Sequence, residues 1–227
     1  MNFMDLKNLK ELADSIPDLG CGGRTVKNEL TLAAFGVRDR RSIIDIAPYL
    51  GSTTAYIGLG VNMSGKKVHV HSYDLWEPSP DYIDKSKKYH NIELNPEEDL
   101  KRRWREYASP FENGGCKIFG HKESIFEARY EDNWKIGLYV DDICNNKRKN
   151  DYAFKLFSPF FVPGETILFL MDWGFHVRDY KPLKYQKAFT DANSHALYYI
   201  GTPPRTYARI FLYTGGEFNY INGDYDE

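Results

Sequence analysis

Aspartates stand at the ends of three hydrophobic runs that we expect to form parallel strands. Asp74 follows one run, Asp141 and Asp142 follow another, and Asp172 follows a third. The carboxyl ends of parallel strands meet at one edge of an open sheet, and ligands of such folds bind there. Carboxylates gathered at that edge can accept hydroxyl protons or ligate a hard cation. A single strand-terminal aspartate is commonplace, so the convergence of the set is what indicates a site.

A turn over residues 47–53 follows the first expected strand and leads into a helix. Gly51 would let the backbone approach a ligand, and the N–H groups of a helix that starts at Ser52 and Thr53 favour an anion such as a carboxylate or phosphate. Asp74 lies 23 residues beyond Gly51, a spacing at which an acid can accept both hydroxyl hydrogens of a ribose. Together these features indicate a nucleoside-type cofactor. The turn holds one glycine, so the dinucleotide pattern GxGxxG is absent.

These positions require strands that alternate with helices. Buried-strand runs occupy residues 41–47, 66–76, 116–120, 134–142 and 163–173. Helical spacing of apolar residues predicts helices at 5–16, 25–36, 54–62, 96–109 and 151–161. Two last runs, 195–201 and 209–215, suit an antiparallel pair. The predicted fold class is therefore α/β: a Rossmann-like, doubly wound, mostly parallel sheet with a C-terminal antiparallel strand pair.

Composition excludes several classes of protein. The 227 residues include 30 basic and 32 acidic side chains, a net charge of −2, which argues against a nucleic-acid partner. The three cysteines form no CxxC pattern, so neither a disulfide framework nor a thiolate zinc site is indicated. Neither a signal-peptide core nor an apolar run long enough for a membrane span occurs. We therefore expect a cytoplasmic protein with no membrane partner.

At four places the chain resembles the class I S-adenosylmethionine-dependent methyltransferases, and among them the compact, macrocin O-methyltransferase-like group that modifies sugars and natural products. The matching segments are RSIIDIAPYLGSTTAYIGLG (41–60), HSYDLW (71–76), IGLYVDD (136–142) and PGETILFLMDW (163–173). The first motif of that group reads acid-x-Gly-x-x-x-Gly-x-Ser/Thr. Here Asp45, Gly51 and Thr53 match it, and Ala47 replaces the first glycine, which narrows the room beside the methionine moiety.

The resemblance implies S-adenosylmethionine as the cofactor and assigns roles around it. The turn 47–53 would hold the methionine part and Asp74 the ribose, with Trp76 just beyond. Ser124 and Ile125 would flank the adenine. The sulfonium is a cation, which suits aromatic faces, so Tyr49 is a candidate for the wall around the methyl group; ordinary packing of that ring is an equal alternative.

Two routes to proton removal remain open. In metal-dependent relatives, acids after the fourth and fifth strands bind Mg²⁺, which lowers the pKa of the acceptor hydroxyl. The matching residues are Asp141 or Asp142, and Asp172; a third protein ligand is not evident. The alternative is a general base, either His176, four residues after Asp172, or His121. We take Asp142, Asp172 and His176 as the candidate catalytic residues.

We expect one domain over residues 1–227, with an N-terminal helical segment at 1–40. An insertion at 77–115 would help to form the acceptor pocket, where aromatic side chains could stack on a ring. The leading hypothesis is methyl transfer to a small-molecule hydroxyl, such as that of a sugar. The alternatives are a nucleotide-dependent oxidoreductase and a non-catalytic, methyltransferase-like binding module. Whether the chain forms a homodimer is left open.

Overall fold

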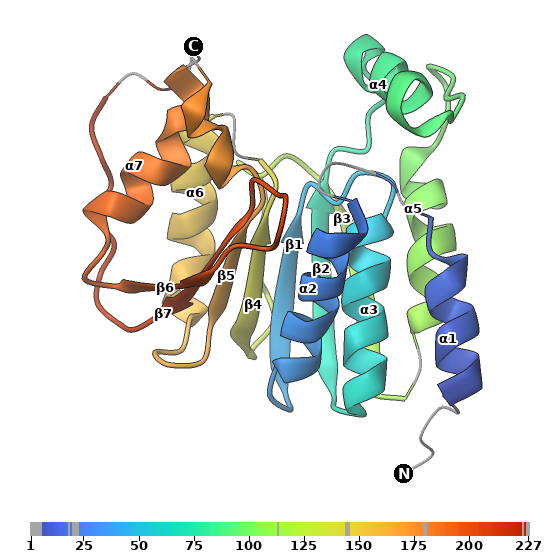
Figure 1. Cartoon of the computed structure of the whole chain (residues 1–227), viewed down its shortest axis with the longest axis horizontal. Helices are drawn as coiled ribbons and strands as arrows, with labels where there is room; N and C mark the ends of the chain where they lie inside the picture. The colour runs from blue at the N-terminus through green and yellow to red at the C-terminus, as the bar shows by residue number, and fades with distance from the viewer. Residues whose placement is uncertain are drawn as a thin grey trace.

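A single sheet forms the middle layer of the molecule (Figure 1). The computed structural model describes residues 6–17, 19, 23–112, 114–143, 146–178, 181–223 and 225. Within them the sheet has seven strands in the order β3-β2-β1-β4-β5-β7-β6. The strands are β1 (Arg41–Ile46), β2 (Val68–Asp74), β3 (Cys116–Lys122), β4 (Lys135–Asp141), β5 (Ile167–Leu170), β6 (Leu197–Gly201) and β7 (Arg209–Tyr213).

The first five strands pair in parallel, whereas β7 runs antiparallel to both β5 and β6. The predicted fold class is thus confirmed, including the C-terminal antiparallel pair. The predicted fifth strand is too long, because β5 covers four residues only. The Thr166 hydroxyl donates to the Ile136 carbonyl and accepts from the Val162 amide, which holds the preceding residues in a turn.

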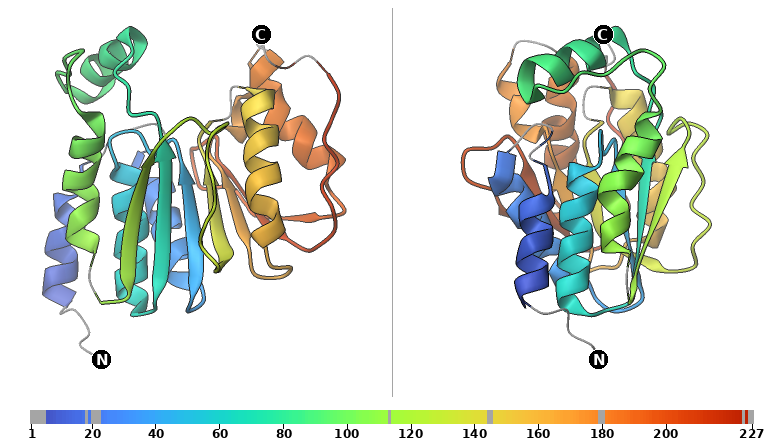
Figure 2. Two further views of the ribbon diagram at one scale, coloured as in Figure 1. Left: turned by 180° about the vertical axis from the view of Figure 1, so that it is seen from behind. Right: turned by 90° about the vertical axis from the view of Figure 1, so that its right-hand side faces the viewer.

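Helices cover the two faces of the sheet unequally. They are α1 (Leu6–Ser15), α2 (Gly23–Gly36), α3 (Ser52–Ser64), α4 (Pro80–His90), α5 (Leu100–Ala108), α6 (Lys147–Phe157) and α7 (Tyr185–Ala192). One face carries α2 and α3, with α1 and α5 beside them, and the other carries α6 and α7. Seen from behind, α6 stands near β4 and β5, while none of the described helices lies in front of β2 and β3 (Figure 2).

Two apolar cores follow from this arrangement. On the α2–α3 side, Leu30, Ile57 and Val70 belong to one buried cluster. On the other side, Tyr139 and Phe154 belong to a second, rich in aromatic rings. Much of the high aromatic content of the chain is therefore structural. No helix in the described ranges combines the length and hydropathy needed to cross a bilayer.

Two helices are not predicted from the sequence. Helix α4 begins at Pro80, in a segment whose prolines suggest irregular structure. Proline is well tolerated in the first helical turn, and Ser79 caps this helix by accepting the Tyr82 amide at 3.2 Å. The helix stands beyond the carboxyl ends of the strands (Figure 1). Helix α7 follows short 3₁₀ segments and is only eight residues long, so its periodicity is weak.

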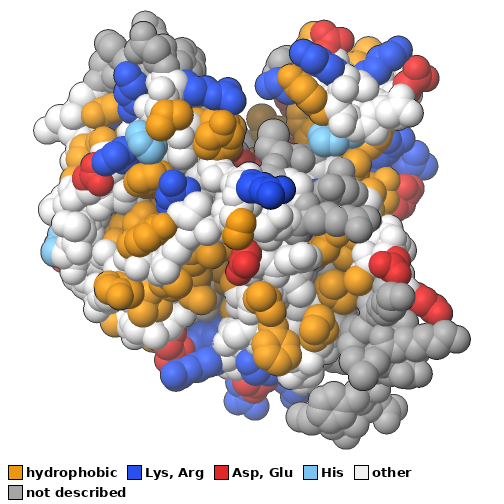
Figure 3. Space-filling view, viewed as in Figure 1, with side chains coloured by type: hydrophobic (Ala, Val, Ile, Leu, Met, Phe, Trp, Pro, Cys, Tyr) orange, Lys and Arg blue, Asp and Glu red, His pale blue; other side chains and the backbone are white. Residues whose placement is uncertain are grey.

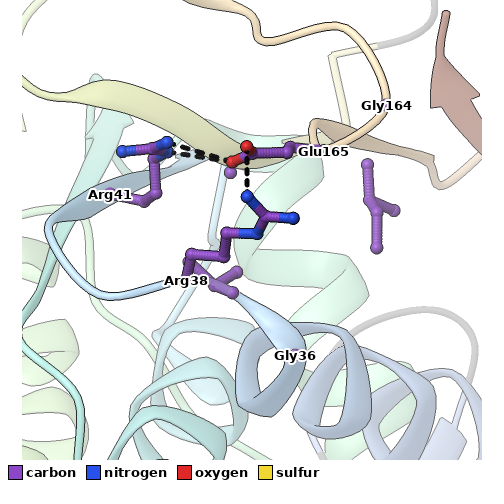
Figure 4. Close-up of a pocket in the computed structure, with 8 residues that line it drawn as sticks. Gly36, Arg38, Arg41, Gly164 and Glu165 are labelled. Carbon is purple, nitrogen blue, oxygen red and sulfur yellow. Dashed lines mark hydrogen bonds and ion pairs between the residues drawn. The ribbon is translucent and has the colours of Figure 1, made fainter.

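An ion-pair cluster closes the opposite, amino-terminal edge of the sheet. Glu165 accepts from Arg38 at 2.7 Å and from Arg41 at 3.0 Å (Figure 4). These residues line a cavity of about 160 Å³ together with Gly36 and Gly164. The cluster ties the turn before β1 to the turn before β5. It lies far from the strand ends that carry the aspartates.

Trp104 locks α5 onto the sheet. Its side chain is 1% exposed, and its indole N–H donates to the Thr54 hydroxyl at 2.9 Å. A Cβ atom on Gly51 would lie 2.9 Å from the ring, and one on Gly120 would lie 2.5 Å from it. Gly51 therefore leaves room for Trp104, whereas the sequence suggested that it leaves room for a ligand.

We predict that Gly51→Ala destabilises the protein by about 2 kcal/mol, because the new Cβ meets Trp104 and the residue has a φ of 98°. That loss corresponds to a fall in Tm of about 6 °C, measurable by thermal unfolding. Gly36→Ala is the matched control, since a Cβ there meets no atom within 4 Å and its Tm should stay near that of the wild type. Equal stability of both variants would contradict the packing role of Gly51.

Candidate functional site

Four aspartates from four strands converge at the carboxyl edge of the sheet. Asp45 lies in β1, Asp74 ends β2, Asp142 follows β4 and Asp172 follows β5. The pKa of Asp142 is raised well above its usual range by burial and by the charges of Asp172, Asp141, Asp45 and Asp74. The acids predicted to meet are therefore close enough to sense one another. On this side the molecular surface is hollowed between α4 and the region of α7 (Figure 3).

Asp45 is the buried member of the group, with 1% of its surface exposed. Its Oδ2 accepts from the Thr54 hydroxyl at 2.6 Å and from the Ser72 hydroxyl at 3.3 Å. Burial raises the pKa of Asp45 to about 7, although both hydrogen bonds lower it. Thr54 in turn accepts from Trp104, so α3, α5, β1 and β2 all meet at this carboxyl. Sequence reasoning missed Thr54 and Ser72, whose small polar side chains follow no motif.

Asp74 lies against the turn that follows β1. Burial raises its pKa to about 6, while the backbone amides of Trp76, Tyr49 and Leu75, and the charge of Lys149, lower it. The Trp76 amide donates to Oδ1 at 2.8 Å. A partly exposed carboxylate held beside the β1 turn is the arrangement that the spacing of Gly51 and Asp74 predicted.

The turn itself carries backbone strain. Three alternate residues have left-handed backbone angles: Ala47 with a φ of 58°, Tyr49 with 56° and Gly51 with 98°. For the two residues other than glycine this costs about 1–3 kcal/mol each. The Ala47 amide donates to the Tyr73 carbonyl at 2.9 Å, which fixes the start of the turn. Ala47 thus adopts the conformation that a glycine would take without strain.

The rings of Tyr49 and Trp76 support the turn. Tyr49 packs on Tyr82 with 4.4 Å between centroids, and its hydroxyl hydrogen-bonds to Ser86 in α4. The Trp76 indole donates to the Tyr49 carbonyl at 3.0 Å, and its side chain is 1% exposed. Trp76 and Trp104 are buried, with 4.9 Å between their ring centroids. Aromatic side chains of this region were expected to stack on an acceptor, but these two indoles are buried and unavailable for it.

Tyr82 presents an orphaned polar atom at the site. Its hydroxyl is buried and has no hydrogen-bond partner among the described residues. Burial and the charges of Asp74 and Asp142 raise the pKa of this phenol, so it stays protonated. The influence of these charges indicates that both acids lie near the Tyr82 ring. A buried hydroxyl without a partner is costly, and a bound ligand that accepted or donated there would satisfy it.

The other predicted cofactor residues have local structural partners. The Ser52 hydroxyl donates to the Pro17 carbonyl at 2.7 Å, and that of Thr53 donates to the Pro48 carbonyl at 3.3 Å. Ser124 accepts the Phe126 amide at 3.4 Å. Ile125 belongs to the second apolar core. The segment that begins at Glu123 adjoins Asp74, because the Glu123 amide donates to the Asp74 carbonyl at 3.2 Å.

Asp141 does not face the site, which corrects its prediction as a metal or cofactor ligand. Its Oδ1 accepts the Ile143 amide at 3.0 Å and its Oδ2 accepts the Tyr139 hydroxyl at 3.1 Å, in a fully buried setting. Burial raises its pKa to about 6. Side chains alternate between the two faces along a strand, so Asp141 points to the same face as Tyr139. Asp142 is therefore the acid of this pair that remains a candidate catalytic residue.

The two candidate bases differ in position. His176 lies in the 3₁₀ segment Trp173–Val177, directly after Asp172. Its Nδ1 lies 2.9 Å from the Trp173 carbonyl; a carbonyl only accepts, so Nδ1 carries a proton and Nε2 is the basic atom. His121 stacks on Tyr73 at 4.4 Å, on the opposite side of the sheet from the Asp45 network. His121 is therefore removed from the candidate bases.

Comparison with known proteins establishes the fold. No protein-family model and no curated sequence matches the chain. The O-methyltransferase NovP has a similar structure, with a TM-score of 0.60 and 11% identity over 85% of this chain and 81% of NovP. An O-methyltransferase candidate from Nostoc punctiforme PCC 73102 has a TM-score of 0.50 and 10% identity over 92% of this chain and 67% of its own. The chain thus has the Rossmann-like fold seen in methyltransferases.

We predict that Asp45 makes folding stability depend on pH. A carboxyl whose pKa rises from 3.8 to about 7 on folding stabilises the folded state when protonated; this contribution is complete below pH 3.8 and is lost as the pH rises through 7. Between pH 5 and 7 the wild type should lose on the order of 2 kcal/mol relative to Asp45→Asn, measured by urea unfolding.

Thr54→Val supplies the internal control for this measurement. It keeps the carboxyl but removes a hydrogen bond that lowers its pKa, so the loss of stability should extend to higher pH than in the wild type. Parallel stability curves for the wild type and Asp45→Asn would contradict the raised pKa.

Proposed function

We propose that the protein is an S-adenosylmethionine-dependent methyltransferase that acts on a small-molecule hydroxyl, such as that of a sugar or natural product. The observation that carries the proposal is the position of Asp74. It ends β2, lies against the β1 turn through the Tyr49 amide, and raises by its charge the pKa of Tyr82, whose buried hydroxyl has no hydrogen-bond partner among the described residues. The two adjacent hydroxyls of a ribose could hydrogen-bond to the Asp74 carboxylate and the Tyr82 hydroxyl in this setting.

The charges at the site support a cationic cofactor. Asp45, Asp74 and Asp142 all have raised pKa values. The protein therefore does not by itself stabilise all three carboxylates in their ionised form. When bound, S-adenosylmethionine supplies a methyl group on a sulfonium cation, whose positive charge would balance part of this cluster. The Tyr82 hydroxyl provides a further hydrogen-bonding group for it.

The chain's own residues divide the work as follows in this proposal. Asp74 accepts the ribose hydroxyls, and the amides of the β1 turn contact the methionine part. Asp142 and Asp172 orient the acceptor hydroxyl at the ends of β4 and β5, and one of these carboxylates accepts the proton that the hydroxyl loses. His176 offers Nε2 as the alternative proton acceptor.

A hard divalent cation fits this donor set in charge and chemistry. Mg²⁺ is commonly held by one or two carboxylates and several waters. With Asp141 removed, Asp142 and Asp172 are the residues that would hold it, and its contribution would be to lower the pKa of a hydroxyl bound to it. Whether turnover needs magnesium is tested by chelation with EDTA.

The acceptor is proposed to be small because the chain shows no basic excess, with a net charge of −2. The region between β2 and β3, which contains α4 and α5, borders the hollow above the strand ends (Figure 3). Tyr82 projects from α4 toward the acids, so this inserted region contributes to the site. An acceptor that enters there would contact α4 before it meets Asp142.

We predict that S-adenosylhomocysteine stabilises the protein, by about 2.7 kcal/mol at a hundredfold excess over Kd, in a thermal-shift measurement. Asp74→Asn should weaken binding at least tenfold, because a neutral amide loses the charge-assisted hydrogen bonds to the ribose. Asp84→Asn, on the exposed side of α4, is the matched control and should bind as the wild type does. Stabilisation by NAD(P) instead would indicate the oxidoreductase, and stabilisation by neither would indicate the non-catalytic module.

We further predict that Asp142→Asn and Asp172→Asn lower turnover by at least 100-fold, the usual contribution of proton transfer, while binding of S-adenosylhomocysteine persists. Turnover is measured as formation of that product with a panel of hydroxylated acceptors. Loss of activity with EDTA and its recovery with MgCl₂ would establish the metal route. Activity that survives EDTA but falls in His176→Gln would establish the base. Full turnover in Asp172→Asn would contradict both.

A further inference from the structure

Three of the six histidines of the chain gather on the side of the sheet opposite the Asp45 network. His69 and His71 alternate along β2 and so point to the same face. His121 lies on β3, where Tyr73 is its register partner. Within the described residues, no helix covers this part of the sheet (Figure 2). The segment between β3 and β4 runs past it instead and brings in Asp132.

We propose that His69, His71 and Asp132 form a binding site for a zinc-type transition-metal dication, separate from the methyl-transfer site. The three ligand atoms lie within 4.8 Å of one another. His69 Nδ1 is 2.7 Å and His71 Nε2 is 3.0 Å from the same carboxylate oxygen, Oδ2 of Asp132. Two imidazole nitrogens and one carboxylate oxygen are a donor set that zinc commonly takes, with water in the remaining position.

Hydrogen bonding alone accounts poorly for this cluster. Oδ2 of Asp132 also accepts the Ser42 hydroxyl at 3.0 Å, so three donors converge on an oxygen with two lone pairs. Ligand atoms around a tetrahedral zinc lie about 3.3 Å apart, given bonds of about 2.0–2.1 Å. Oδ2 of Asp132 is closer than this to both imidazole nitrogens, at 2.7 and 3.0 Å, and all three ligand atoms lie within 4.8 Å of one another. Adjustments on the order of 1 Å would therefore admit the ion. Asp132 lies in a connecting segment, which can shift by this amount.

The surroundings fix the ligands as an outer shell of a metal site does. The other ring nitrogen of His71, Nδ1, is 3.1 Å from His121 Nε2, so Nδ1–H of His71 can donate a hydrogen bond to His121 while Nε2 of His71 binds the ion. The ring of His69 stacks on Trp134 at 3.9 Å. The Trp134 amide donates to the second oxygen of Asp132 at 3.1 Å.

An ion could reach the cluster from solvent. A cavity of about 310 Å³ adjoins it, lined by His71, His121 and Asp132 together with the acids Glu123 and Glu131 and the base Arg129. The two acids exceed the one base, which favours entry of a cation. The side chain of His69 is 21% exposed and that of Asp132 is 10% exposed, so the site is enclosed without being sealed.

The test is metal binding by the untagged full chain after treatment with EDTA and desalting. Titration with ZnCl₂ in a calorimeter should show one equivalent bound with a Kd of micromolar or below. His69→Gln and Asp132→Asn should each weaken binding at least tenfold. His195→Gln is the matched control, because His195 is an exposed histidine that contacts the Glu217 carbonyl, and it should bind zinc as the wild type does.

Zinc-edge X-ray absorption on the wild type provides a readout that does not depend on the folding of variants. Scattering from two imidazoles at about 2.0 Å is expected, and a shell without imidazole would overturn the proposal. So would wild-type binding weaker than millimolar, or equal binding by the wild type and both ligand variants. No cofactor or acceptor enters these experiments, so their result is independent of methyl transfer.

Discussion

The hydrogen-bond path from Trp104 through Thr54 to Asp45 holds the site together. The indole belongs to α5, the hydroxyl to α3 and the carboxyl to β1, so one buried path of two bonds, 2.9 and 2.6 Å long, joins the inserted region to the centre of the sheet. Gly51 and Gly120 exist as glycines because the ring fills the space of their Cβ atoms. The β1 turn can keep its left-handed residues because this packing over-determines it, which is how strained backbone persists in folded proteins.

The same packing explains why so much negative charge is tolerated at one edge. Enclosed carboxylates near one another raise each other's pKa. Burial of the apolar rings around them stabilises the fold and offsets the unfavourable free energy of burying these groups. Asp45 and Asp74 have pKa values of about 7 and 6, so near neutral pH their charge depends on what else is bound. A cation bound beside these acids would favour their ionised forms.

Much of the fold could be predicted from sequence because buried parallel strands are continuous apolar runs. The sheet order β3-β2-β1-β4-β5-β7-β6 could not, because it differs from the order of the strands along the chain. For the site, only the residues that end strands or form the β1 turn could be predicted from the sequence. Asp74 does lie beside the β1 turn, and its role in ribose binding stays a prediction. Asp141 and Asp142 are adjacent, and only the alternation of side chains along β4 decides which of them joins the Tyr139 side. Nothing local reveals that the Tyr49 ring packs on Tyr82 of α4 or that the Trp76 ring packs on Trp104 of α5. Asp132 gave no signal, since it meets His69 and His71 only through a long connection.

Strand β2 shows how one segment can serve two kinds of site. Its period of two sends Ser72 toward the Asp45 network and sends His69 and His71 to the opposite face. The sheet between them keeps the carboxylate cluster and the histidine cluster apart, so the two clusters share no side chain. They still meet at one point, where the Glu123 amide donates to the Asp74 carbonyl at 3.2 Å. The segment that leads from there to Asp132 therefore begins at the proposed ribose site and ends at the proposed metal site, and an ion that holds its far end would limit the motion of its near end.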